Sequence, residues 1–203
     1  MRNDLHFSTG RNVTATPSPT VDMFVARYTG GRPFTTDIAA LASNAKAPQY
    51  VGPDHVDPAR RDCLTISWPR ACDGELIFLN PPYGRTENAC KHTVVDGQVL
   101  SFAPCAKKRC EKRGWHTAVR IPGCELFVKK AVEEARLGSE VFALLAARTD
   151  TGWFHDYLWD HDARTWRPGV DGWFLPDRIA FIRAEGSDDS APFPSLLVRL
   201  FQP

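Results

Sequence analysis

The chain has 203 residues, of which 43% are hydrophobic and six are tryptophan, so it suits a single globular domain with one substantial core. A formal net charge of +1 excludes a protein that is basic over its whole surface, and any nucleic-acid footprint must therefore be local. The first twenty residues lack the apolar run of a signal peptide and no segment approaches the roughly 20 apolar residues of a membrane span, which indicates a cytoplasmic protein.

Buried strands and helices are predicted to alternate along the chain. In chain order, the sequence predicts a loose N-terminal arm over 1–20, a helix over 21–28, a weak strand over 34–38, a buried strand over 75–80, a helix over 125–138, a buried strand over 140–147, a helical segment over 151–160, and strands over 177–184 and 195–201. This alternation predicts an α/β fold, a mostly parallel sheet whose last two strands form an antiparallel hairpin. Residues 86–123 form an irregular, cysteine-rich insertion in the single domain 1–203.

The clearest functional motif directly follows the buried strand "ELIFLN". The sequence "NPPY" at Asn80–Tyr83 continues that strand, and ligands of open α/β sheets bind outside the carboxyl ends of the strands. Pro81 and Pro82 stiffen the backbone and have no N–H, so the nearby carbonyls remain acceptors, and the Asn80 side chain adds another. Two acceptors beside the Tyr83 ring suit a nucleobase with an exocyclic amine, although Asn and Pro also favour ordinary turns.

This motif resembles the catalytic motif of S-adenosylmethionine-dependent amino-methyltransferases, which act on adenine N6, cytosine N4 or a protein glutamine. Further segments extend the resemblance to the phage-type DNA N-6-adenine methyltransferase (Dam-like) family; they are "TTDIAALASNAKAPQY", "NPPYGR", "CAKKRCEKRGWH", "PGCELFVKKAVEEARLG", "LLAARTDTGWFHD" and "SAPFPSLLV". Together they cover most of residues 35–198. The resemblance implies a Rossmann-like methyltransferase sheet and methyl transfer to adenine in double-stranded DNA, in a bacterium or a phage-infected cell.

The same resemblance implies a role for each residue of the motif. Asn80 and the Pro81 carbonyl would accept hydrogen bonds from the target amine, Pro82 would stiffen the corner, and Tyr83 would stack on an adenine flipped out of the duplex. As the methyl group arrives, the amine nitrogen becomes tetrahedral and positively charged, and fixed acceptors stabilise that change. The proposed chemistry therefore requires no strong base.

Three residues are candidates for binding S-adenosylmethionine. The segment "TTDIAAL" resembles the family's first motif, in which an acidic residue ends a strand and small residues let the backbone approach the cofactor, which implies roles for Asp37 and Ala39. The glycine-rich loop of many methyltransferases is absent. Asp62, eighteen residues before Asn80, matches the usual position of an acidic residue near the cofactor's adenine. For both aspartates, a solvated turn is the alternative.

The cysteine-rich insertion has the composition of a structural zinc site. Its "CAKKRCEKRGWH" supplies Cys105, Cys110 and His116, and Cys90 is the natural fourth ligand of a tetrahedral ion. His92 or Cys124 could replace one of these ligands, and free thiols in a loop are the alternative to a metal. An insertion with so few core-forming residues commonly needs a metal to become ordered, which favours zinc.

The same insertion supplies the local basic footprint. Basic residues far outnumber acidic ones between Cys105 and Arg120, and they can neutralise DNA phosphates. Trp115 is a candidate for stacking on or wedging beside an extruded base, although tryptophan more often packs in a core. Arg148, in the loop with Asp150, is a candidate for the same cleft or for a local ion pair. The predicted nucleic-acid-binding residues are Lys107, Lys108, Arg109, Lys112, Arg113, Trp115 and Arg148.

Two classes of function are compatible with these motifs. The first is a DNA adenine-N6 methyltransferase, with cytosine N4 or a protein glutamine as alternative methyl acceptors. The second is a catalytically silent, zinc-stabilised nucleic-acid-binding module that keeps the corner only as structure. Binding of S-adenosylmethionine separates the two classes, and double-stranded DNA is the expected partner of the first. No sequence feature indicates an oligomeric state.

Overall fold

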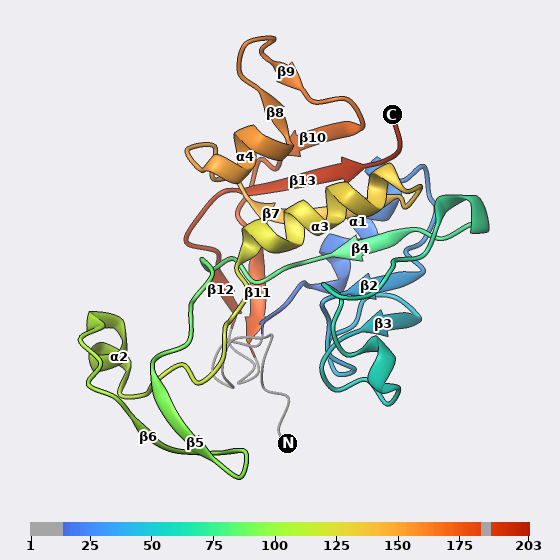
Figure 1. The fold of residues 1–203 in the computed structure, drawn as a ribbon. Coiled ribbons are helices and arrows are strands. Elements are labelled where there is room, and N and C mark those ends of the chain that lie inside the picture. The colour runs from blue at the N-terminus through green and yellow to red at the C-terminus, as the bar shows by residue number, and fades with distance from the viewer. Residues whose placement is uncertain (1–13, 184–187) are drawn as a thin grey trace.

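The computed structural model describes residues 14–183 and 188–203, and its centre is a six-stranded sheet (Figure 1). The strands of this sheet are β2 Thr36–Ile38, β3 Gln49–Val51, β4 Ile77–Leu79, β7 Val141–Ala146, β10 Val170–Phe174 and β13 Ser195–Leu200. The α-helices are α1 Ser18–Tyr28, α2 Lys108–Arg113, α3 Cys124–Arg136 and α4 Gly152–Tyr157, with 3-10 turns at Pro58–Arg60 and Ala71–Asp73. Within the described ranges, no helix has the length and apolar character needed to cross a membrane.

Smaller sheets surround this centre. The remaining strands are β1 Thr14–Ala15, β5 His92–Val95, β6 Gln98–Phe102, β8 Trp159–Asp160, β9 Thr165–Trp166, β11 Ala180–Arg183 and β12 Asp188–Ser190. Strands β1, β11 and β12 form a three-stranded antiparallel sheet, whereas β5–β6 and β8–β9 are separate hairpins.

The strand order of the central sheet is β10-β13-β7-β4-β2-β3. Strands β3, β2, β4 and β7 are parallel, and β13 is antiparallel to both of its neighbours. From β2 the chain continues to β3 on one side, and from β4 it continues to β7 on the other, so the order reverses between β2 and β4. Such a reversal marks the ligand-binding edge of an open α/β sheet. Ile38 pairs with Leu79, so the chain leaves both strands side by side at Ala39 and Asn80.

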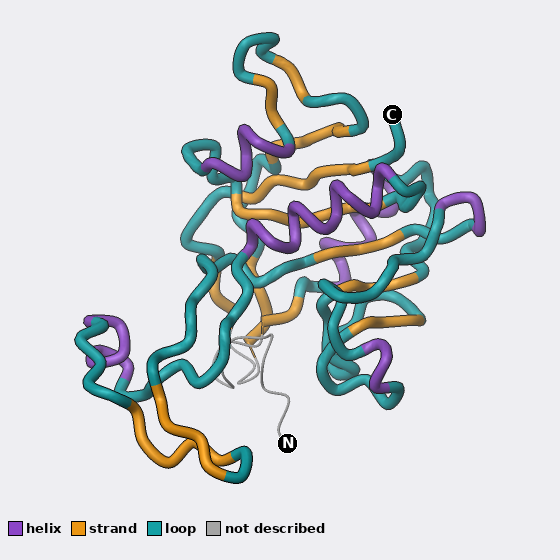
Figure 2. Tube along the Cα trace, viewed as in Figure 1, coloured by secondary structure: helices purple, strands orange, loops and turns teal. Residues whose placement is uncertain are grey.

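Helices cover both faces of the central strands, which explains why these strands are continuous apolar runs. On one face, Phe127 and Ala131 of α3 pack with Leu79. On the other face, Phe24 of α1 packs with Phe78, with ring centroids 6.4 Å apart. Figure 2 shows the two helices on opposite sides of the sheet. Alternate residues of β4 therefore face two separate apolar clusters.

Most of the predicted elements are present. Helices α1, α3 and α4 and strands β2, β4, β7, β11 and β13 lie at the segments where the sequence predicts them. Helix α3 ends as its sequence indicates, because Gly138 follows with a φ of 101°, a conformation that disfavours other residues. The mixed α/β architecture with a mostly parallel central sheet is thereby confirmed.

The predicted C-terminal hairpin is wrong. Strand β11 pairs with β1 and β12, whereas β13 lies between β7 and β10. The long connection between β11 and β13 does not fix a register as a two-residue turn would, so the sequence leaves the pairing undetermined. Strand β10 is hard to predict because Gly172 interrupts its apolar pattern; a Cβ there would overlap the Trp166 ring.

The predicted loose arm is also partly wrong. Thr14 and Ala15 pair with β11, and α1 already begins at Ser18. Thr16, which lies between β1 and α1, is only 2% exposed. Residues 1–13 of the predicted arm lie outside the described residues.

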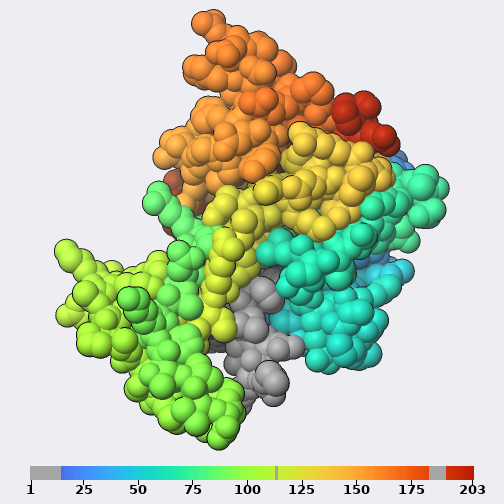
Figure 3. Space-filling model, in the orientation of Figure 1, coloured from blue at the N-terminus to red at the C-terminus, as the bar shows by residue number. Residues whose placement is uncertain are grey.

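The cysteine-rich insertion projects from the body of the protein (Figures 1 and 3). It is less irregular than predicted, because it contains the hairpin β5–β6 and the short helix α2. In Figure 1, the arrowheads of β2, β3 and β4 point toward the side on which the insertion lies. The insertion therefore stands at the carboxyl edge of the parallel strands.

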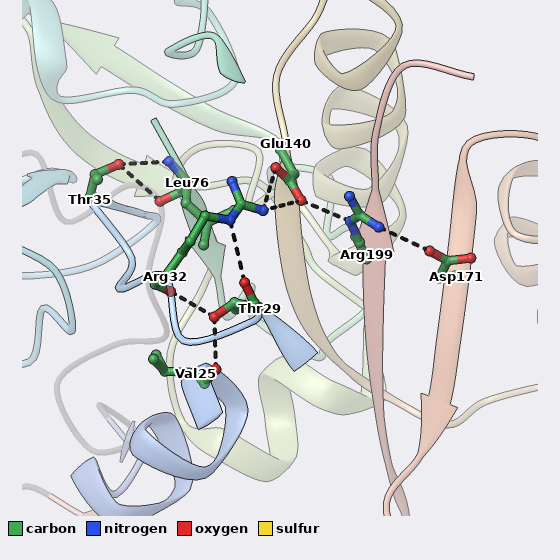
Figure 4. Close-up of polar contacts among 8 residues, drawn as sticks. All are labelled: Val25, Thr29, Arg32, Thr35, Leu76, Glu140, Asp171 and Arg199. Carbon is green, nitrogen blue, oxygen red and sulfur yellow. Dashed lines mark hydrogen bonds and ion pairs between the residues drawn. The ribbon is translucent and has the colours of Figure 1, made fainter. Parts of the chain in front are cut away.

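An ion network around the buried Glu140 holds the opposite edge of the sheet (Figure 4). Glu140, which precedes β7, has a side chain only 7% exposed and accepts hydrogen bonds from Arg32 Nη2 at 2.8 and 2.9 Å. Arg199 of β13 donates from Nε to the same carboxylate at 2.8 Å and lies 3.4 Å from Asp171 of β10. Glu140 thus connects the loop after α1 to the antiparallel side of the sheet.

We expect Glu140→Ala to lower the free energy of unfolding by about 2 kcal/mol, measured by urea denaturation. Removing the buried partner leaves two guanidinium groups together, but both are partly exposed, so water screens much of the penalty. Asp171→Ala is the matched control, because Asp171 is 45% exposed, and it should cost under about 0.5 kcal/mol. Equal losses in the two variants would contradict the central role of Glu140.

Candidate active site and cysteine–histidine cluster

The "NPPY" corner begins where β4 ends, and its side chains form one hydrogen-bonded unit. The Tyr83 hydroxyl donates to Asn80 Oδ1 at 2.6 Å. Asn80 Nδ2 in turn donates to Thr16 Oγ1 at 3.0 Å. The Asn80 carbonyl oxygen keeps a second lone pair. Among the described residues, no hydrogen bond reaches the Pro81 carbonyl. The corner therefore presents oriented acceptors.

An aromatic wall stands beside this corner. The Tyr83 ring meets the Phe193 ring edge-on at 5.0 Å and lies 5.9 Å from that of Phe181. The Arg148 guanidinium carbon lies 5.8 Å from the centre of the Phe193 ring. Arg148 thus lies beside the corner through its contact with Phe193. Burial raises the pKa of Tyr83 well above its ordinary value, so the phenol remains a neutral donor at physiological pH.

Phe193 and Thr16 have no role assigned from the sequence. Phe193 lies in "SAPFPSLLV", a segment that resembles the family but has no polar group to suggest chemistry. Thr16 lies in a segment whose composition predicts a loose arm. An aromatic residue in a loop directly before a buried strand is the only local signal for Phe193. Thr16 has none, because its contact with Asn80 spans 64 residues.

Asp37 is buried within β2. The residue is only 3% exposed, and its Oδ2 accepts a hydrogen bond from the backbone N–H of Lys46 at 2.8 Å. Burial raises the pKa of Asp37 from 3.8 to about 7, although the Lys46 amide and ammonium groups lower it in part. Desolvation thus outweighs the attraction of the Lys46 ammonium group, and among the described residues no ion pair within 4 Å is formed by the Asp37 carboxyl group.

The residues directly after β2 have a constrained backbone. Ala39 has a φ of 71°, a left-handed conformation that costs energy in a residue other than glycine and is often found at functional sites. The N–H groups of Ala39 and Ala40 both bond to the Val51 carbonyl at the end of β3. Gly52 permits this close approach, since a Cβ there would overlap the Ala40 carbonyl oxygen. The ends of β2 and β3 are therefore tied together.

An aspartate that the sequence does not single out lies near these ends. Asp54 follows β3 and accepts a hydrogen bond from the Ala42 N–H at 3.0 Å. Asp62, by contrast, accepts from the Leu64 N–H at 3.0 Å, as expected of an aspartate that stabilises a turn. The predicted cofactor role of Asp62 thus has less structural support than that of Asp37.

The insertion brings together the four side chains that the cysteine spacing indicates. Ligand atoms of Cys90, Cys105, Cys110 and His116 all lie within 4.8 Å of one another. Cys90 Sγ is 3.6 Å from Cys110 Sγ and 3.7 Å from Cys105 Sγ. A tetrahedral zinc with Zn–S bonds of about 2.3 Å places its sulfurs about 3.8 Å apart. His116 Nδ1 is buried without a hydrogen-bond partner among the described residues. The donor set therefore fits a tetrahedral metal.

Neither of the two alternative ligands belongs to this group of four. His92 Nδ1 is 2.7 Å from the Cys90 carbonyl oxygen, and Cys124 starts helix α3, where burial raises its pKa to about 12. In the cluster, desolvation raises the pKa of Cys90, but hydrogen bonds from Thr117, His116 and the other thiols outweigh it and lower the pKa to about 6. A thiolate, the form that binds metals, is thus favoured at Cys90 near neutral pH.

The predicted DNA-binding residues of the insertion divide into two groups. Lys107 Nζ donates to the Asn88 and Ala89 carbonyls, and Arg109 Nε lies 3.6 Å from Glu87 Oε2, so both side chains stabilise the insertion itself. Lys108 and Lys112 are exposed on α2, while Trp115 is half-buried. The side chain of Arg113 lies outside the described atoms. Lys108 and Lys112 remain the clearest candidates for phosphate contacts.

A two-stranded stalk joins the insertion to the corner. Glu87 and Ile121 exchange both backbone hydrogen bonds at 2.9 Å, and the Cys90 N–H donates to the Thr117 carbonyl at 2.7 Å. At its base, the Cys124 N–H donates to the carbonyl of Gly84, the residue after Tyr83, at 2.9 Å. The metal-ligand cluster is thus mounted directly on the loop that carries the "NPPY" motif.

One comparison with known proteins identifies a relationship over nearly the whole chain. The family model described as DNA N-6-adenine-methyltransferase (Dam) matches residues 7–201. Neither a curated protein nor a solved structure matches the chain. The matched range includes the corner, the insertion and every strand of the central sheet.

Proposed function

The chain belongs to the DNA N-6-adenine-methyltransferase (Dam) family, and we propose that it transfers a methyl group from S-adenosylmethionine to N6 of an adenine flipped out of double-stranded DNA. The observation that carries this proposal is the side-by-side exit of the chain from β2 and β4 at the reversal of strand order. The "NPPY" corner and the Asp37 segment, expected to serve the base and the cofactor, meet at this edge. The parallel strands are proposed to be a shortened Rossmann-like sheet.

In the proposed step, the N6 lone pair attacks the methyl carbon and the electron pair of the carbon–sulfur bond goes to sulfur. The methylated N6 is then positively charged and releases one proton to water. S-adenosylmethionine supplies the electrophilic methyl group. The second lone pair of Asn80 Oδ1 and the Pro81 carbonyl accept hydrogen bonds from N6 as its charge develops. The Tyr83 hydroxyl, donating to the first lone pair, fixes the Asn80 amide in the required orientation. The acceptors are therefore oriented before the substrate arrives.

The aromatic wall supplies the remaining contacts to the base. A flipped adenine loses its stacking in the duplex and regains it on the Tyr83 ring. Phe193, edge-on to Tyr83, holds that ring in place, and Arg148 lies over Phe193 where it can meet a nearby phosphate. Stacking provides affinity, and the acceptors of the corner provide selection for an exocyclic amine.

Asp37 is proposed to bind the cationic amino group of S-adenosylmethionine. The burial of the carboxyl group and its raised pKa support this role, because a buried carboxyl group whose charge is not fully compensated is complementary to a cationic ligand. Ala39 and Ala40 are small enough to let that ligand approach the end of β2. Asp54, at the end of β3, is proposed as a further polar contact to the cofactor.

We expect Asp37→Asn to make the protein more stable at pH 8 and yet weaken its cofactor binding at least tenfold. The folded protein holds the Asp37 proton up to a pKa of about 7, whereas the unfolded chain releases it near 3.8. The stability contributed by this group is therefore complete below about pH 4 and is lost as pH rises through 7, by an amount on the order of 4 kcal/mol. Asparagine does not ionise, so the variant does not lose this stability as the pH rises.

The measurements are urea unfolding at pH 5 and pH 8 and calorimetric titration with S-adenosylmethionine. Asp54→Asn is the control for the unfolding measurements, since Asp54 is exposed and its replacement should leave stability nearly unchanged. An Asp37→Asn protein with unchanged affinity for the cofactor would reduce Asp37 to a structural residue.

The cysteine–histidine cluster is proposed to hold one structural zinc ion through Cys90, Cys105, Cys110 and His116. Four protein ligands would close the coordination sphere, which is typical of zinc sites that stabilise a fold rather than catalyse a reaction. The role of the ion would be to order the insertion, so that the exposed lysines of α2 are held at the carboxyl edge of the sheet.

The proposed activity is tested by incubating the protein with methyl-labelled S-adenosylmethionine and mixed-sequence DNA, then digesting the DNA and identifying the labelled nucleoside. Label in N6-methyladenine is the expected result. Label in N4-methylcytosine would change the substrate base, and label in the protein fraction would indicate a glutamine acceptor. DNA binding without any label would favour the silent binding module.

A further inference from the structure

The hairpin β5–β6 of the insertion exposes apolar side chains on both of its faces. Val94 and Val95 on β5 are 50% and 48% exposed, and Val99 and Leu100 on β6 are 39% and 63% exposed. Neighbouring residues of a strand point to opposite faces, so no single covering surface explains all four. A solvated hairpin has no need of four large apolar residues around one turn. The composition therefore indicates an apolar partner for the tip.

The tip is stiff. Its turn consists of Asp96 and Gly97, with φ values of 49° and 76°, as in the two-residue turn that best matches the twist of a hairpin. The register shifts between Thr93 and Val94, where β6 contains one additional residue, Leu100. Such a bulge redirects the side chain of its additional residue, and Leu100 is the most exposed of the four.

The base of the hairpin is held by the cysteine–histidine cluster. Phe102, the last residue of β6, stacks on the His116 ring with centroids 4.4 Å apart, and it also contacts His92. The stalk then connects the cluster to Gly84, directly after the corner. The cluster and the stalk thus connect the hairpin to the proposed active site.

The charge around the hairpin favours a polyanion as its partner. Residues 86–123 contain seven Lys and Arg against three Asp and Glu, whereas the whole chain has a net charge of only +1. Lys91, directly before β5, and Lys108 and Lys112 on α2 are exposed. A second copy of this positive insertion would be repelled, but duplex DNA is attracted. Within duplex DNA, the space between base pairs is the apolar environment available to such side chains.

We propose that the hairpin tip, led by Leu100, is a wedge that inserts between base pairs of duplex DNA beside the base that is methylated. The proposal rests on the proposed function, since the base flipped into the corner leaves a gap in the stack. An apolar side chain in that gap would slow the return of the base. The exposed lysines would hold the flanking phosphates while the tip is inserted.

The test uses Leu100→Ser with Leu137→Ser as its matched control. Leu137 is equally exposed, at 64%, but lies at the far end of helix α3 from the insertion. A nicked plasmid is closed by ligase in the presence of each full-length protein, and the topoisomer distribution reports how far the protein unwinds the duplex. Affinity for a mixed-sequence duplex is measured at two salt concentrations, and thermal unfolding checks that each variant is folded.

Wild type and Leu137→Ser should both shift the topoisomers. Leu100→Ser should lose at least about half of that shift and bind DNA up to about tenfold more weakly, while keeping the same salt dependence. Equal shifts for Leu100→Ser and Leu137→Ser would overturn the wedge, as would a wild-type dimer that Leu100→Ser dissociates. The labelled-transfer assay separates the two proposals. A shift without methylation would reject the proposed function but keep the insertion of the tip between base pairs, and methylation without a shift would keep the proposed function and reject the insertion.

Discussion

Asn80→Ala is expected to reduce methyl transfer to DNA about 10²- to 10³-fold, the loss typical of removing one group that stabilises developing charge. The acceptor matters most as N6 becomes tetrahedral, so kcat should fall while the affinity for S-adenosylmethionine stays nearly unchanged. Single-turnover transfer and calorimetry measure the two quantities. Turnover within about threefold of wild type would contradict the role of Asn80.

The hydrogen bonds of Asn80 determine the controls. Tyr83→Phe keeps the stacking ring but removes the hydroxyl that donates to Asn80 Oδ1, so we expect an intermediate loss of about tenfold. Thr16→Val removes the acceptor of Asn80 Nδ2 at the opposite end of the amide. A loss as large in Thr16→Val as in Asn80→Ala would indicate that the structure of the corner, rather than its acceptor, accounts for the effect.

The corner was predictable because its chemistry is local. Asn80, Pro81 and Tyr83 lie within four consecutive residues that follow an apolar run. In any fold that places this run in a sheet, they stand together at the end of a strand. The contacts of Tyr83 with Phe193 and of Asn80 with Thr16 are not local. They depend on how the N-terminal segment and the loop before β13 pack, and no short pattern encodes that packing.

The sheet shows the same division between local and long-range information. Strands β4 and β7 are predictable as continuous apolar runs, and α3 from its periodic apolar face. The pairing of β10 with β13 is not predictable, because β10 contains Gly172 and is joined to the rest of the domain by short irregular segments. Strand β3 is equally inconspicuous, since only one of its three residues, Val51, is buried.

Asp37 illustrates a different limit. Its position in "TTDIAAL" indicates an acidic residue at the end of a strand, but not that the carboxyl would be almost fully buried with one hydrogen bond. That burial depends on the chain segment that returns over β2 and places the Lys46 amide against the side chain. The raised pKa, and with it the pH test of the cofactor site, follows only from the folded structure.

Removal of the metal is expected to have the largest effect on the insertion. Purified protein should contain one zinc per chain, and a chelator should disorder residues 88–117 while the central sheet remains folded. Structural zinc sites in small peptides contribute apparent free energies of about 10–16 kcal/mol, and for such segments the binding free energy is the folding free energy. The hairpin base depends on this cluster through the stacking of Phe102 on His116.

Loss of zinc should affect the binding of DNA and of S-adenosylmethionine differently. Without zinc, affinity for DNA should fall sharply because the lysines of α2 and the hairpin lose their placement, whereas affinity for S-adenosylmethionine should change little. Cys105→Ser removes a half-buried ligand, and Cys72→Ser, at an exposed cysteine outside the cluster, is the matched control that should keep its zinc. Elemental analysis, hydrogen exchange and calorimetry provide the measurements.

Protein prepared without chelators that lacks stoichiometric zinc would exclude the metal site. A chelator that unfolds the sheet and the insertion together would show that the body depends on the metal as well, through the stalk that links Cys124 to Gly84.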